Sequence, residues 1–323
     1  MPSYSGVWTL TAQYQAIGAG NWPESFFPPG DIALLAGGDT GFGVGFNTIN
    51  RVTISTTGNA TNFGTLSSKR FAGAAAGSTS RALFFGGYVI AGGVSNVIEY
   101  TTFATTGSVS DFGDLITPDY RISGSGNATR AFVAGGDSVT NVIQYVTIAS
   151  AGNAIDFGDL INTISTTPAA CASPTRGIVA GGFSGGGASN VIQYITIATT
   201  GNATDFGDMT LGRVNLAGTS SSTRGLFFGG EGATKSNIID YITIASTGNA
   251  TDFGDLLFAN YYIAAASNNT RAIVSGDYSS PGNPTNVIQY VTIASTGNAI
   301  DFGDLTYSTA YQAGCSNGSG GVQ

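Results

Sequence analysis

The sequence has 323 residues with 11 basic and 19 acidic side chains, a formal net charge of -8 and only 9% charged residues. An acidic chain of this kind is a poor match for nucleic acid or an anionic membrane, so we expect neither as a partner. It contains no histidine, which excludes histidine–metal sites and serine–histidine triads. No stretch approaches the roughly 18 apolar residues of a membrane-spanning helix, and no secretory signal peptide is evident.

Residues 1–30 lie outside any repeat and are rich in large apolar side chains. We expect them to form a docking or anchor arm, separate from one larger domain over residues 31–323. The candidates for contact within this arm are Trp8, Leu10, Tyr14, Trp22, Phe26 and Phe27. Aromatic side chains are enriched where proteins meet, so we expect the arm to dock on another subunit. Folding of the arm against its own domain is the alternative.

Beyond the arm, a phrase best seen at Asn286–Leu305 recurs along the chain. Its copies begin at Asn47, Asn96, Asn141, Asn190, Asn237 and Asn286, which by subtraction lie 45 to 49 residues apart. A period in this range is typical of a repeated supersecondary unit.

Each repeat is predicted to form four strands. In the fifth, Arg224–Gly230 is an apolar run that ends at a glycine pair, and Asn237–Ile244 is rich in β-branched residues. A turn containing glycine and asparagine leads to a third strand from Thr251. The remaining strand of each repeat is almost wholly small, as in Ala217–Thr219. Because small side chains are needed where strands crowd around an axis, these strands should line a central channel. The sequence therefore predicts an all-β, six-bladed β-propeller with four strands per blade.

Both ends of the repeat region are expected to share one blade. After Phe302 the chain supplies only the small-residue strand Ala310–Ser316, whereas Ile32–Gly38 has the composition of a strand ending in a glycine pair. Closure of this kind removes exposed sheet edges. Cys171 and Cys315 then fall on channel strands of opposite blades, which predicts two free, buried thiols.

The repeats resemble the kelch repeat. The resemblance lies in the glycine pair, a tyrosine in the next strand and a large aromatic residue before the final strand. The tyrosines are Tyr100, Tyr145, Tyr194, Tyr241 and Tyr290, and phenylalanine stands where kelch repeats usually carry tryptophan. Arg51 and Ser275 depart from the pattern. The resemblance covers about residues 31–316 and implies a kelch-like fold, but it says little about function.

A second resemblance concerns the origin of the chain. The opening Val-Trp-Thr-Leu and Gln-Tyr-Gln-Ala motifs, followed by Trp-Pro, are similar to the start of virion proteins from marine tailed phages. The phrase Gly-Asn-Ala-Thr-Asp-Phe-Gly-Asp-Leu resembles tail-associated propeller sequences of the same group. These similarities imply a tail or fibre protein that is assembled in the bacterial cytoplasm into an oligomeric virion. Its residues 1–30 would then contact other virion proteins.

Two repeated polar motifs have structural and functional interpretations. The Asp-Phe-Gly-Asp pairs lack the dense oxygen spacing of a calcium loop, so we expect turn hydrogen bonding and no metal or cofactor. An arginine follows serine or threonine in the turn that leaves each of five channel strands. We expect these arginines to bridge strands or blades by pairing with the aspartates, and an anion-binding ring is the alternative. They are Arg81, Arg130, Arg176, Arg224 and Arg271.

The opposite face should carry the loops that follow the glycine pairs and the linkers that precede the channel strands. A rigid scaffold with varied loops on one face is a common way to build a binding surface, and tyrosine can stack on sugar rings while its hydroxyl bonds polar groups. The ligand-face candidates are Tyr88, Tyr120, Arg121, Phe183, Arg213, Tyr261, Tyr262, Tyr278 and Tyr307.

We therefore expect a virion adhesion module, without catalytic residues, that contacts a glycan or receptor on the host surface. The alternatives are a purely architectural virion protein and a carbohydrate-active enzyme.

Overall fold

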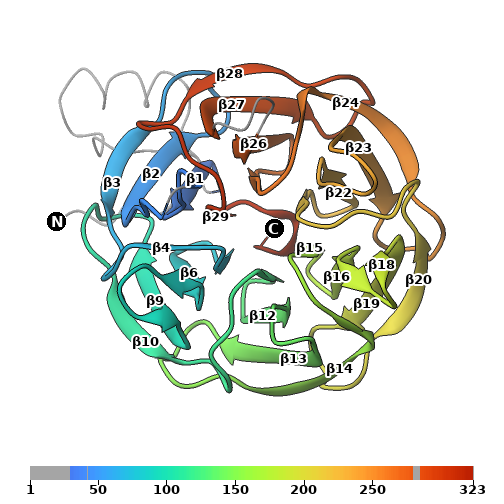
Figure 1. The fold of residues 1–323 in the computed structure, drawn as a ribbon, viewed down its shortest axis with the longest axis horizontal. Coiled ribbons are helices and arrows are strands. Elements are labelled where there is room, and N and C mark those ends of the chain that lie inside the picture. The colour runs from blue at the N-terminus through green and yellow to red at the C-terminus, as the bar shows by residue number, and fades with distance from the viewer. Residues whose placement is uncertain (1–29, 42, 279–283, 323) are drawn as a thin grey trace, which may run out of the picture.

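The computed structural model describes residues 30–41, 43–278 and 284–322. Over these residues the chain is all-β and forms six four-stranded antiparallel sheets, arranged as blades around a central axis (Figure 1). The predicted six-bladed β-propeller is confirmed. Among the described residues, no helix has the length and apolar character needed to cross a membrane. The arm candidates Trp8, Leu10, Tyr14, Trp22, Phe26 and Phe27 lie outside the described residues.

The blades follow one another in chain order, each written here from its innermost strand outwards. Blade 1 contains β29 (Ala313–Ser316), β1 (Ile32–Ala36), β2 (Thr48–Thr53) and β3 (Thr61–Thr65). Blade 2 contains β5 (Ala74–Gly77), β6 (Arg81–Phe85), β9 (Val97–Thr102) and β10 (Ser110–Asp114). Blade 3 contains β11 (Ile122–Gly126), β12 (Arg130–Gly135), β13 (Thr140–Thr147) and β14 (Ile155–Ile164).

Blade 4 contains β15 (Ala169–Ala172), β16 (Arg176–Ala180), β19 (Val191–Thr196) and β20 (Thr204–Asp208). Blade 5 contains β21 (Ala217–Ser220), β22 (Arg224–Phe228), β23 (Ser236–Thr243) and β24 (Thr251–Asn260). Blade 6 contains β25 (Ala264–Ser267), β26 (Arg271–Tyr278), β27 (Pro284–Thr292) and β28 (Ile300–Asp304). The loops between the blade strands form two further small sheets. One contains β4 (Arg70–Phe71), β7 (Tyr88–Val89) and β8 (Gly93–Val94), and the other contains β17 (Phe183–Ser184) and β18 (Gly187–Ala188).

The predicted small-residue strands line the axis. Strands β5, β11, β15, β21, β25 and β29 are each in contact with the next around the ring. Their side chains bound two cavities of about 60 and about 30 Å³ along the channel. Spaces of this size hold water molecules rather than a ligand. These two channel cavities are therefore too small for an organic ligand.

The ring is closed by strands from opposite ends of the repeat region. Strand β29 pairs with β1, with Cys315 opposite Leu34. The short helix η1 (Gly320–Val322) then lies across one end of the channel, near the centre of the ring (Figure 1). The Ala128 N–H donates to the Gly321 carbonyl over 3.1 Å. The predicted closure is confirmed, and the additional helix contacts the channel strands β11, β15 and β21.

We call this end of the ring the hairpin face, because it carries the turns between the outer two strands of each blade. The opposite end is the loop face. On the hairpin face, each turn packs against the outermost strand of the preceding blade. The Gly152 N–H donates to the Phe112 carbonyl over 2.7 Å, and the Asn153 side chain accepts the Asp114 N–H over 3.0 Å. The same contacts recur at other seams between consecutive blades.

This contact explains the glycine of Asp-Phe-Gly-Asp. Gly113 has a φ of +149°, and a β-carbon there would lie 2.5 Å from the Gly152 backbone. Any other side chain would push the two blades apart. Phe112 is buried in the blade interface. The repeated phrase is thus a blade-to-blade contact, in which asparagine makes the side-chain bond to the neighbouring backbone.

The five repeated arginines join consecutive blades, but not by the predicted pairing with aspartate. Each guanidinium stacks on the tyrosine of its own blade and donates to backbone carbonyl oxygens of the next blade. Arg224, for example, lies over Tyr241 and donates to the carbonyls of Ile293 and Ala294 over 3.0 and 2.9 Å. The pairs are Arg81–Tyr100, Arg130–Tyr145, Arg176–Tyr194, Arg224–Tyr241 and Arg271–Tyr290, with Cζ 4.6 to 4.9 Å from the ring centroid.

We call this arrangement the arginine clamp. The aspartate prediction was wrong because the backbone carbonyls at each seam are closer acceptors than the carboxylates, and because the tyrosine ring holds the guanidinium in place. In blade 1 the two corresponding positions hold Ile32 and Arg51, which face Thr53 and Leu34 in the β1–β2 pairing. Blade 1 therefore has no arginine–tyrosine pair at these two positions, unlike the other five blades.

The clamp predicts a local contribution to stability. Replacement of Arg224 by methionine keeps much of the aliphatic stem but removes the cation–π contact and two hydrogen bonds. We expect a loss of about 1–2 kcal/mol in the free energy of unfolding, measured by urea denaturation. The control is Lys69→Met, since the Lys69 side chain is exposed. An equal loss in both variants would contradict the clamp.

The cysteines provide a second test of the ring. Both Cys171 and Cys315 are free and buried, as predicted, and burial raises the pKa of both thiols. Because the thiolate is the reactive form, Ellman's reagent should label neither residue in the folded protein and both after unfolding in urea. Rapid labelling of either thiol without denaturant would show that its blade is not packed as described.

Candidate functional site

The mouth of the channel on the loop face is built by six residues in the left-handed backbone conformation. One precedes the innermost strand of each blade, and together we call them the mouth residues. They are Ala72, Arg121, Thr166, Asn215, Tyr262 and Tyr311, with φ between 55° and 64°. Left-handed φ is uncommon for residues other than glycine, and such strain is often found at functional sites. Each linker therefore contains one residue in an unfavourable backbone conformation, where the chain turns sharply at the mouth.

Backbone hydrogen bonds between blades hold this conformation. The Tyr311 N–H donates to the Tyr262 carbonyl over 2.8 Å, and the Ala72 N–H donates to the Tyr311 carbonyl over 2.9 Å. The Arg121 N–H donates in turn to the Ala72 carbonyl over 2.6 Å. The pattern continues on the other side, where the Tyr262 N–H reaches the Asn215 carbonyl. Five of the six mouth residues, all except Thr166, are thus held relative to one another by backbone hydrogen bonds.

Aromatic rings form a continuous arc beside the mouth. Tyr262 and Tyr311 stack with their centroids 3.7 Å apart. On one side Tyr311 contacts Phe71 at 5.6 Å, and on the other Tyr262 contacts Tyr261 at 4.4 Å. The complete arc, which we call the aromatic arc, is Tyr120, Tyr88, Phe71, Tyr311, Tyr262, Tyr261 and Tyr278. All seven side chains are partly exposed.

Cations lie at both ends of the aromatic arc. Arg121 lies 5.4 Å from the Tyr120 ring, and Asp137 bonds both residues, with 3.2 Å to the guanidinium and 2.9 Å to the hydroxyl. At the other end, the ammonium group of Lys235 lies 4.9 Å from the Tyr261 ring. Burial raises the pKa of the Tyr120, Tyr261 and Tyr311 hydroxyls, so these groups stay protonated and can donate hydrogen bonds.

The structure brings together six of the nine predicted ligand-face residues. Tyr88, Tyr120, Arg121, Tyr261, Tyr262 and Tyr278 all belong to the aromatic arc or its cationic ends. Phe183 is 41% exposed but lies in the β17–β18 hairpin, apart from the arc. Tyr307 stacks on Phe46, and its hydroxyl donates over 3.2 Å to backbone carbonyls of blade 1. Whether any of them binds a ligand stays a prediction.

Arg213 has to be removed from the ligand-face set. Its side chain has no exposed surface and pairs with Asp240, which is equally buried, over 2.5 Å. It also donates to the carbonyl oxygens of Gly229 and Ile238 over 2.7 and 2.8 Å. Burial lowers the pKa of this guanidinium, and the charge of Asp240 partly offsets that effect. Arg213 therefore joins blade 4 to blade 5 and cannot reach a ligand.

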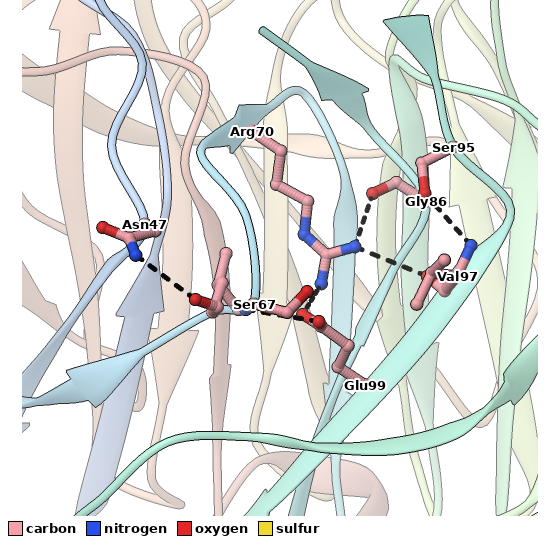
Figure 2. A network of polar contacts seen from close by, with 8 residues as sticks. Asn47, Ser67, Arg70, Gly86, Ser95, Val97 and Glu99 are labelled. Atoms are coloured by element: carbon pink, nitrogen blue, oxygen red, sulfur yellow. Dashed lines mark hydrogen bonds and ion pairs between the residues drawn. The ribbon is translucent and has the colours of Figure 1, made fainter. Parts of the chain in front are cut away.

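A second buried pair joins blade 1 to blade 2. Figure 2 shows Arg70 between the Glu99 carboxylate and the carbonyl oxygens of Gly86 and Val97. At the other four seams the residue that corresponds to Glu99 and Asp240 has a neutral amide side chain. These residues are Asn50, Gln144, Gln193 and Gln289. The amide oxygen of Gln193, for example, accepts the Ile161 N–H over 2.8 Å. An arginine in the linker thus accompanies the carboxylate at each seam where the amide is replaced.

Sequence reasoning missed Phe71 and Tyr311. They carry no motif of their own, and only an alignment of the six linkers on the channel strands would have placed them with Tyr261 and Tyr262. The described residues contain no cluster of three or more histidine, cysteine, aspartate or glutamate side chains with metal-binding geometry. A comparison with protein-family models found no match, and no curated protein matches the chain.

The buried pair at blades 4 and 5 predicts strong energetic coupling. Arg213→Ile leaves the Asp240 carboxylate without its counter-charge, so we expect a loss of about 3–5 kcal/mol in the free energy of unfolding. The double variant Arg213→Ile, Asp240→Gln copies the natural Ile164 and Gln193 pair of another seam and should lose markedly less. Urea denaturation of both single variants and the double variant measures the coupling. A double variant no more stable than Arg213→Ile would contradict this interpretation.

Proposed function

We propose that this chain is a non-enzymatic binding module of a phage virion, carried on the tail or fibre, whose loop face contacts a glycan on the host surface. The aromatic arc is the observation that carries this proposal. The virion setting rests on the sequence resemblance of residues 1–30 and of the repeat phrase. In this setting the protein is assembled in the bacterial cytoplasm, and residues 1–30 contact other virion proteins.

The chemistry of the arc suits a sugar ligand. The flat, partly exposed rings offer apolar surface to the C–H faces of a sugar ring, while tyrosine hydroxyls offer hydrogen bonds to its polar edge. The stack of Tyr262 and Tyr311 lies at the centre of the arc, and both residues are fixed by backbone hydrogen bonds. A surface that is already ordered loses little conformational entropy on binding, which favours recognition of a ligand with few contacts.

The charged groups near the arc support binding rather than a reaction. Asp137 is bonded to Tyr120 and Arg121, and Asp277 accepts bonds from Thr285 and from Asn260. These carboxylates hold loops and side chains in position, so the proposal assigns them no catalytic step.

A purely architectural virion protein is the alternative from another class, because aromatic side chains are also enriched in protein–protein interfaces. It predicts that the arc is covered by a neighbouring subunit in the particle and that the isolated chain binds no glycan.

The proposal predicts a selective effect of substitutions in the arc. On a glycan array, Tyr262→Ala and Tyr311→Ala should each weaken binding about tenfold, which corresponds to roughly 1.4 kcal/mol of lost stacking. Phe258→Ala is the matched control, since Phe258 is an aromatic residue that is 48% exposed and lies outside the arc. Equal binding by all three variants, or no binding by the unmodified chain, would reject the glycan proposal.

A further inference from the structure

The guanidinium of Arg121 lies among the rings of the aromatic arc. Arg121 is a mouth residue with a φ of 58°, and its guanidinium carbon is 5.4 Å from the centroid of the Tyr120 ring. Burial acts to lower the pKa of this guanidinium, but the surrounding phenol groups, Tyr262 foremost, and the Asp137 carboxylate raise it above its ordinary value. The cation is therefore within electrostatic reach of the stacked Tyr262 and Tyr311 at the centre of the arc.

Most of the hydrogen-bonding capacity of Arg121 is unused. A guanidinium carries five N–H donors. Among the described residues, one of these donors bonds Asp137 over 3.2 Å, and the buried Nε–H has no partner. The Arg121 side chain is 30% exposed, and an ion pair as exposed as this one contributes little to stability. Arg121 can therefore bind a further acceptor without first breaking a strong contact.

The cation at the other end of the arc also has spare donors. The Lys235 ammonium group lies 4.9 Å from the Tyr261 ring and donates to the Tyr278 carbonyl over 3.1 Å. An ammonium group has three N–H donors, so this contact leaves two of them for a ligand. The rings of the arc thus lie between two cations that can each accept a negatively charged partner.

The carboxylates at the two ends of the arc are already engaged. Asp137 accepts hydrogen bonds from Tyr120 and Arg121. Glu231 accepts the side-chain N–H of Asn215 over 3.0 Å. The charged groups that keep unused hydrogen-bonding capacity toward a ligand are therefore the two donors. Such a surface is complementary to a ligand that supplies acceptors and negative charge.

We propose that the glycan bound at the aromatic arc carries a carboxylate, as uronic and sialic acids do, and that Arg121 binds this group. The inference rests on the proposed function and narrows it to acidic glycans. A carboxylate is planar and accepts two parallel N–H bonds from one edge of a guanidinium. The stack of Tyr262 and Tyr311 contacts the sugar ring, while Arg121 selects the acidic sugar over a neutral one of the same shape.

The experiment compares each acidic glycan with its own methyl ester. Oligosaccharides of uronic and sialic acids are printed on an array beside their methyl esters, and the full chain is titrated over both. The ester keeps the ring and the hydroxyls but removes the negative charge. We expect the unmodified chain to bind the acid at least about tenfold more tightly than the ester, because hydrogen bonds between charged groups are stronger than those to a neutral group.

Three variants separate the role of Arg121 from that of the rings. Arg121→Gln should bring the ratio of acid to ester affinity close to one. Lys69→Gln is the matched control, since it removes an exposed positive charge outside the arc, and it should keep the ratio of the unmodified chain. Tyr262→Ala should weaken the binding of both forms, because stacking on the sugar ring does not require the carboxylate. Circular dichroism checks that each variant is folded.

A fourth variant predicts a gain of affinity. Asp137→Asn removes the carboxylate that competes for Arg121, while the amide oxygen can still accept the Tyr120 hydroxyl. The acidic glycan should then bind roughly threefold more tightly, a change that matches the small contribution of an exposed ion pair. Weaker binding of the acid by this variant would contradict the assignment of Arg121 as the carboxylate-binding residue.

The outcomes distinguish this inference from the proposed function. Equal binding of acid and ester by the unmodified chain, with both weakened by Tyr262→Ala, would overturn the carboxylate and leave glycan binding in place. An unchanged ratio in Arg121→Gln would also overturn it. Absence of binding to every glycan on the array would reject both proposals. Sulfated oligosaccharides on the same array provide the last test, since stronger binding of these would assign the site to a sulfate ester instead.

Discussion

Close backbone approach between consecutive blades is the constraint on which the rest of this propeller depends. The turn of each blade lies against the outermost strand of the blade before it, and Gly113 or its counterpart leaves room for that contact. Because the contact is repeated around the ring, each blade fixes the position of the next. The six linkers at the channel mouth are then brought to a common end of the ring, where four of them contribute residues to the aromatic arc.

The two faces of the ring share the same six-fold arrangement of blades but differ in how far their side chains repeat. On the hairpin face, arginine, tyrosine and the Asp-Phe-Gly-Asp phrase are repeated because they join blades. On the loop face, the side chains at corresponding positions differ from blade to blade, and stacking of aromatic rings is added to the backbone hydrogen bonds between the mouth residues. The buried pairs of Arg70 with Glu99 and Arg213 with Asp240 lie beneath that face. Each pair distinguishes its seam from the four seams that carry a neutral amide. Because both pairs are buried, neither offers a charged group to a ligand.

The fold could be predicted from the sequence because its determinants recur. The six copies of the phrase predicted the number of blades, and the alanine and glycine content of one strand type placed that strand on the axis. The side-chain partners were harder to predict. The clamp arginines were assigned to nearby aspartates, because a sequence shows opposite charges but does not show that backbone carbonyls of the next blade lie closer. Arg213 was placed on the ligand face for a related reason, since its buried partner Asp240 comes from another blade. Tyr311 was missed because its significance lies in its left-handed backbone and in its stacking on Tyr262.

The pairing of β29 with β1 has a consequence for biosynthesis. Strand β1 emerges from the ribosome before its inner neighbour β29, because nearly the whole propeller sequence lies between the two strands. Until β29 arrives, the inner edge of β1 carries unpaired N–H and C=O groups, and such edges are templates for pairing with other chains. Two nascent chains held close together during that interval can exchange their β29 strands. Spacing between ribosomes, or a chaperone that covers the edge, would then govern the yield of correctly closed monomers.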